Sequence, residues 1–92
     1  MAVKVISFYQ EGCMGCKEQT PILLEAAADL GIEIEEIDAV KNPEYIQKYN
    51  LRVTPTTLVL DGDEIRERME GLVHSEDLEA AIRRHLPEPL PR

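Results

Sequence analysis

The sequence predicts a single α/β domain built on a mixed four-stranded β-sheet, with three helices distributed over both faces of the sheet. Two observations predict it. The first half of the chain reads strand, helix, strand, which requires parallel strands joined by a right-handed crossover. The second half contains two short strands around a glycine turn, and such a hairpin adds antiparallel strands. We therefore expect the strand order 2-1-3-4, a domain over residues 1–86 and a proline-rich tail over residues 87–92.

Hydrophobic periodicity predicts the elements of the first half. Residues 3–9 are apolar on both faces, as in a strand covered on both sides. Residues 13–30 have a helical period, with Pro21 expected to kink the helix and Gly31 to end it. Residues 32–38 form a second strand whose glutamates indicate an edge position. The helix's expected buried stripe comprises Ile22, Leu23, Ala26, Ala27 and Leu30.

Cap and turn residues predict the elements that follow. Asn42 and Pro43 suit the N-cap and first position of a short helix that runs to about residue 50. Residues 56–60 and 64–69 are the third and fourth strands, and Gly62 supplies the tight turn between them.

The last helix is expected to begin at Ser75. Ser75 is a favourable N-cap, and Glu76 and Asp77 follow in the first turn, where the helix dipole favours acidic side chains. The inner stripe of this helix is expected to comprise Leu78, Ala81, Ile82 and His85.

Composition limits the classes of partner. The chain has 92 residues and a formal net charge of −8, which argues against binding to nucleic acid or to anionic lipid. No apolar run approaches the ~20 residues of a membrane helix, and the N-terminus does not resemble a secretory signal. We therefore expect a cytoplasmic protein that acts as a monomer without nucleic-acid or membrane partners.

The only two cysteines of the chain, Cys13 and Cys16, lie where the first strand gives way to the first helix. Amide groups at a helix N-terminus favour a thiolate and lower the pKa of a cysteine there, and Lys17 adds a nearby cation. The thiolate is the attacking species in disulfide exchange. We therefore expect Cys13 to attack a substrate disulfide and Cys16, one turn further on, to resolve the mixed disulfide.

Two other interpretations of the cysteine pair are open. A structural zinc site needs four ligands, and the chain offers only His74 and His85 besides the pair. We therefore expect no metal within one chain, although two motifs could bridge a dimer through zinc or an iron–sulfur cluster. The cysteines could also be inert and buried, but the glycines on both sides leave the sulfurs little cover.

Pro55 stands just before the third strand. A proline that enters a strand needs no functional explanation. If the hairpin joins the sheet beside the first strand, however, this loop lies next to Cys13. A cis Pro55 would then leave the backbone of Thr54 available to pair with an extended substrate segment.

Taken together, these residues resemble the thioredoxin/glutaredoxin superfamily, from about Val3 to Leu86. The resemblance implies a thioredoxin-like fold, a Cys13–Cys16 redox couple and a cis-proline at Pro55. It also places Pro21 at the helix kink and Gly71 in the substrate groove. We expect Thr54, Pro55, Gly71 and Met14 to contact the substrate and Lys17 and Tyr9 to support the site.

The sequence also departs from the family. The family's extra N-terminal strand and helix are missing, and Gly12 replaces the usual tryptophan. Met14-Gly15 replaces the usual Gly-Pro dipeptide. The buried acid that helps to deprotonate the resolving cysteine aligns with Ser7, and its lysine neighbour aligns with Ile34.

The predicted function is that of a thiol–disulfide oxidoreductase without a cofactor. It reduces disulfides in proteins or small thiols and draws electrons from a reductase or a thiol donor. The alternative, motivated by Ser7, is a non-catalytic redox sensor or binding module on the same fold.

Overall fold

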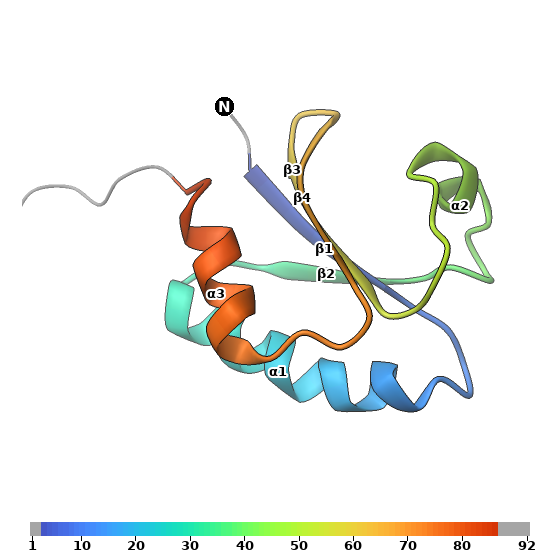
Figure 1. Ribbon diagram of the computed structural model, residues 1–92, viewed down its shortest axis with the longest axis horizontal. Coiled ribbons are helices and arrows are strands. Elements are labelled where there is room, and N and C mark those ends of the chain that lie inside the picture. The colour runs from blue at the N-terminus through green and yellow to red at the C-terminus, as the bar shows by residue number, and fades with distance from the viewer. Residues whose placement is uncertain (1–2, 87–92) are drawn as a thin grey trace, which may run out of the picture.

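The computed structural model describes residues 3–86 as one four-stranded mixed sheet with three helices (Figure 1). The sheet order is β2-β1-β3-β4, as predicted. β1 pairs parallel with β2 and antiparallel with β3, and β3 pairs antiparallel with β4. The predicted tail over residues 87–92 lies outside the described residues. The elements are β1 Val3–Tyr9, α1 Met14–Leu30, β2 Ile34–Asp38, α2 Glu44–Lys48, β3 Thr56–Asp61, β4 Glu64–Glu70 and α3 Ser75–Arg83.

The hydrophobic core has two parts, one on each face of the sheet. Val5 and Val59 pack against Leu23 of α1 and Leu78 of α3 on one face. The other face is covered by α2, as Figure 1 shows. There, Phe8 is fully buried and lies against a pair of tyrosines, Tyr45 and Tyr49, whose rings stack 5.9 Å apart. The predicted arrangement of helices on both faces is confirmed.

The second strand begins later than the sequence predicts. Gly31 adopts the left-handed conformation, with φ of +67°, and ends α1 as expected. The N–H of Ile32 then donates to the carbonyl of Ala27 at 3.0 Å. This bond completes the helix C-cap, so Ile32 is not available to the sheet and β2 starts at Ile34.

Two predicted helix caps are wrong. Asn42 does not cap α2. Its side-chain Nδ2 donates to the carbonyl of Asp38 at 3.0 Å, and Pro43 occupies the N-cap position. Ser75 is the first residue of α3 rather than its cap, because the first helical bond runs from the N–H of Leu78 to the carbonyl of His74.

The prediction that His85 lies on the inner stripe of the last helix is also wrong. α3 ends at Arg83, so His85 lies beyond the helix and outside its stripe. Its Nε2 lies 2.7 Å from Oε2 of Glu67 on β4. This contact, together with two hydrogen bonds from Arg84 to the same carboxylate, ties the end of α3 to the sheet.

Candidate active site

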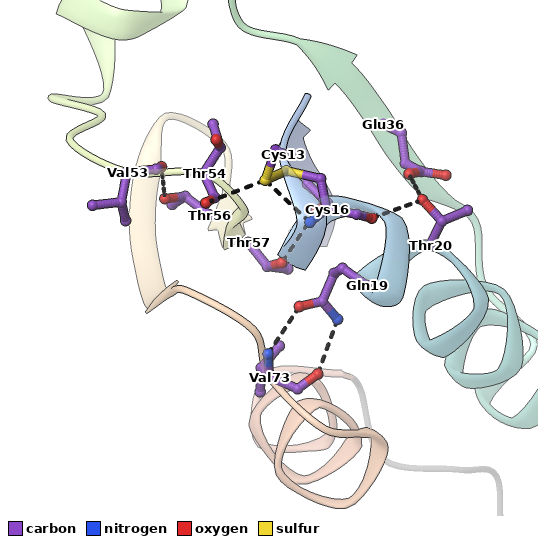
Figure 2. Close-up of a disulfide and its surroundings, with 11 residues drawn as sticks. Cys13, Cys16, Gln19, Thr20, Glu36, Val53, Thr54, Thr56, Thr57 and Val73 are labelled. Atoms are coloured by element: carbon purple, nitrogen blue, oxygen red, sulfur yellow. Dashed lines mark hydrogen bonds between the residues drawn. A yellow bond between two sulfur atoms is a disulfide. The ribbon is translucent and has the colours of Figure 1, made fainter. Parts of the chain in front are cut away.

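The two cysteines form a disulfide at the N-terminus of α1 (Figure 2). Cys13 is the N-cap residue, with extended backbone angles, and Met14 is the first helical residue. The backbone N–H of Cys16 donates to Sγ of Cys13 at 3.1 Å. A serine or aspartate oxygen makes this bond in ordinary caps. Here a sulfur makes it, and the same amide can stabilise the Cys13 thiolate after reduction.

The two cysteines differ in their exposure. Cys16 is buried, with 6% of its surface exposed, whereas Cys13 is half-buried. Met14 between them is 72% exposed, and Lys17 is exposed on the next turn. Cys13 is therefore the more accessible cysteine of the pair.

The loop before β3 lies against the disulfide. Sγ of Cys13 is 3.5 Å from the carbonyl oxygen of Thr54, and the Thr54–Pro55 peptide bond is cis. A Cβ at Gly15 would lie 3.3 Å from Cδ of Pro55. Gly15 therefore allows the helix and the proline ring to approach closely.

The segment after β4 forms the next wall of the site. Gly71, with φ of +85°, donates its N–H to the carbonyl of Pro55 at 2.8 Å. Two residues later, Val73 makes two hydrogen bonds with the side chain of Gln19, one at 2.8 Å and one at 2.9 Å. Gln19 is buried within α1, so this amide fixes the segment to the active-site helix (Figure 2).

A cavity of about 530 Å³ opens on the other side of the disulfide. Both cysteines line it, together with Tyr9, Lys17, Gln10, Glu11, Gly12, Thr20 and Glu36. The hydroxyl of Thr20 donates to Oε2 of Glu36 at 2.9 Å. This hydrogen bond joins an exposed acid of β2 to α1 at the cavity that both cysteines line.

A smaller hollow of about 140 Å³ lies on the Thr54 side of the site. It is lined partly by apolar side chains that remain exposed, with Val40 at 62%, Ile46 at 40% and Val53 at 46%. These side chains form an exposed apolar surface on the Thr54 side of the site.

The position expected for the family's buried acid holds a neutral pair. Ser7 is buried and lies 3.2 Å from the hydroxyl of Thr57 on β3. Among residues 3–86, no group of three His, Cys, Asp or Glu side chains is arranged to hold a metal ion. Within the same residues, no helix combines the length and apolar character needed to cross a bilayer.

Comparison with known proteins identifies the family. The family model described as Thioredoxin matches residues 2–84. The chain belongs to the thioredoxin family. It is 33% identical over 84 residues to "Thioredoxin 2" of Plasmodium berghei (strain Anka), a match that covers 89% of this chain and 54% of that protein. The chain thus spans about half the length of this relative.

Two further relatives agree. Thioredoxin of Staphylococcus aureus is 29% identical over 86 residues, covering 91% of this chain and 83% of that protein. A solved structure of thioredoxin-2 from a malaria parasite matches with a TM-score of 0.84 and 27% identity, covering 91% of this chain and 84% of that one. With the Cys13–Cys16 pair in place on this fold, the chain is a thiol–disulfide oxidoreductase of the thioredoxin family.

The structure brings the predicted site residues together from four segments. Cys13, Cys16, Met14 and Lys17 come from the start of α1, Tyr9 from the end of β1, Thr54 and Pro55 from the loop before β3, and Gly71 from the turn after β4. Sequence reasoning missed Gln19, Thr20 and Glu36. Only Gln19 carried a signal, because it is a polar residue at the spacing of the buried stripe Leu23, Ala26 and Leu30.

Proposed function

We propose that this thioredoxin-family chain reduces protein disulfides, with Cys13 as the attacking thiolate and Cys16 as the resolving thiol. The observation that carries the proposal is the geometry of Cys13. Cys13 is the more exposed residue of the two, and its sulfur accepts a helix N-terminal amide and lies 3.5 Å from the Thr54 carbonyl oxygen. These features favour the anion and direct the substrate to this sulfur.

The exchange proceeds in two steps. The Cys13 thiolate attacks one sulfur of the substrate disulfide, and the other sulfur leaves as a thiolate. Cys16 then attacks Sγ of Cys13, which releases the second substrate thiolate and forms the Cys13–Cys16 disulfide. Two electrons pass to the substrate, and a reductase or thiol donor returns the pair to the dithiol.

The walls of the site favour an extended protein segment over a small disulfide. The backbone of Thr54 lies outside β3 at the edge of the site, beside the cis Pro55. Gly71 has no side chain that would block an approaching segment. The exposed side chains of Met14, Val40 and Val53 provide apolar contact area. We assign Thr54, Pro55, Gly71 and Met14 to substrate contact, with Lys17 and Tyr9 as supporting residues.

We also propose that the chain acts as a monomer in the cytoplasm. The reducing conditions there keep thiols reduced and suit a dithiol that must be regenerated after each turnover. The net charge of −8 supports a partner with a basic surface.

A redox sensor on the same fold is the second candidate, and the neutral Ser7–Thr57 pair favours it. Serine and threonine hydroxyls do not serve as proton acceptors at neutral pH as carboxylates do. Resolution would then be slow, and a mixed disulfide would accumulate instead of turning over.

Insulin reduction with dithiothreitol as electron donor tests the proposal. We expect wild-type protein to accelerate the reduction through many turnovers, Cys13→Ser to be inactive, and Cys16→Ser to form a stable mixed disulfide. Unchanged activity in Cys13→Ser would overturn the assignment, and a single turnover by wild type would favour the sensor. An equilibrium redox titration against glutathione then separates a reductant from an oxidant.

A further inference from the structure

An acidic side chain lies one strand away from the position where the family's buried acid is missing. We propose that Glu36, fixed by Thr20, accepts the proton that Cys16 loses when it resolves the mixed disulfide. The assignment rests on the proposed two-cysteine mechanism and supplies the proton acceptor that Ser7 cannot.

The sheet register places this acid. Ser7 on β1 is paired with Thr57 on β3 and with Glu36 on β2, so the three residues form one row across three strands. Directly paired residues have side chains on the same face of a sheet. Val5, two residues before Ser7, packs against α1, so the row lies on the face that α1 covers. The carboxylate therefore shares this face with the active-site helix.

A hydrogen bond from α1 orients the carboxylate. Thr20 lies one turn after Cys16, and its hydroxyl is 2.9 Å from Oε2 of Glu36 and 3.3 Å from the Cys16 carbonyl oxygen. Figure 2 shows this chain of contacts from Cys16 through Thr20 to Glu36. Because the hydroxyl donates to Oε2, the other carboxylate oxygen is left to accept a proton from the cavity side.

The cavity provides the path. Cys16 and Glu36 both line the space of about 530 Å³, which exceeds the roughly 30 Å³ that one water molecule occupies. The other titratable or charged groups that face this space are Tyr9 of β1, Glu11 of the β1–α1 loop, Lys17 of α1 and the thiol of Cys13. Lys17 is the one cation among these groups. Glu11 is the competing acid and must be tested separately.

Resolution moves one proton and exchanges one disulfide bond for another. The thiol proton of Cys16 passes through cavity water to the Glu36 carboxylate, and the resulting thiolate attacks Sγ of Cys13. The bond between Cys13 and the substrate sulfur breaks, and that sulfur leaves with the electron pair. The departing thiolate takes a proton from solvent or from Glu36, which returns the carboxylate to its ionised form.

Reaction of the reduced protein with 5,5′-dithiobis(2-nitrobenzoate), followed by stopped-flow absorbance, separates the two chemical steps. The first equivalent of thionitrobenzoate reports attack by Cys13, and the second reports resolution by Cys16. We expect Glu36→Gln to slow only the second phase at neutral pH, by about a hundredfold, the lower end of the contribution of a positioned general base. The deficit should close above about pH 8.5, where an ordinary thiol ionises without help.

Three other variants sharpen the test. Glu35→Gln is the matched control, because Glu35 directly precedes Glu36 on β2 and pairs with Lys4 at the surface. It should behave as wild type in both phases. Glu11→Gln removes the competing acid of the cavity and should not reproduce the slow second phase of Glu36→Gln. Thr20→Val should slow the second phase less than Glu36→Gln does, and it carries the test if Glu36→Gln fails to fold.

Several results would overturn the assignment. These are a Glu36→Gln trace equal to that of Glu35→Gln, a deficit that is the same at every pH, or a deficit that appears in Glu11→Gln instead. If wild type itself releases only one equivalent, the two-cysteine mechanism fails, and the role of Glu36 fails with it. Two wild-type phases that Glu36→Gln leaves unchanged would overturn the role of Glu36 alone.

Discussion

Gln19 uses both ends of its amide to hold the backbone of Val73, and Gln19→Leu removes this link while keeping a side chain of similar size. Gln19 is 1% exposed, and its two hydrogen bonds measure 2.9 Å and 2.8 Å. The substitution leaves one N–H and one C=O of the half-buried Val73 unpaired. An unpaired buried group costs about 1–3 kcal/mol, and the lower value suits partial burial.

The expected loss for Gln19→Leu is therefore about 2 kcal/mol of unfolding free energy. For a domain of this size that corresponds to a decrease in Tm of about 8–16 °C. Urea unfolding followed by circular dichroism, with the disulfide intact, measures it. Gln47→Leu is the control, because Gln47 is exposed on α2 and should change stability by less than about 0.5 kcal/mol. Equal stability of the two variants would refute the idea that Gln19 holds the wall of the site.

Three further predictions concern stability and the site. The hydrogen bond from Arg84 lowers the pKa of Glu67, as does His85, so this carboxylate stabilises the fold above its unfolded pKa and the contribution is lost as pH falls. The unfolding free energy of Glu67→Gln, measured by urea unfolding at a series of pH values, should therefore decrease less at acidic pH than that of wild type, by about 1 kcal/mol at most. An equal decrease in the two proteins would contradict this. Phe8→Ala, at a fully buried ring, should cost about 3–5 kcal/mol in the same assay, and a loss below 1 kcal/mol would show that the ring is not a core residue. Gly15→Ala should lower kcat/KM for insulin reduction, since its Cβ would lie 3.3 Å from the ring of Pro55; full activity would show that this close approach is dispensable.

The sheet order and the positions of the helices could be predicted because local signals and topology agree. The strand–helix–strand half requires parallel pairing, and Gly62, with φ of +62°, supplies the tight turn of the second half. The placement of Cys13 at a strand-to-helix junction followed from the same pattern. These features depend on residues that are neighbours in sequence.

The features that were predicted wrongly or missed depend on partners that are distant in sequence or on competition between partners. Asn42 is of a residue type that often caps helices, but its side chain donates to the carbonyl of Asp38 instead. Glu36 belongs to the site only because the β1–β2 register pairs it with Ser7 and because Thr20 reaches it from α1. No periodicity along β2 contains that information.

Competitive alkylation tests the central claim most directly. The reduced protein is treated at neutral pH with less than one equivalent of iodoacetamide, and the modified cysteine is identified by mass spectrometry of its peptides. Cys13 should carry nearly all of the label, because its sulfur is the more accessible one and accepts the N–H at the start of α1. Equal labelling of the two cysteines, or preferential labelling of Cys16, would contradict the account.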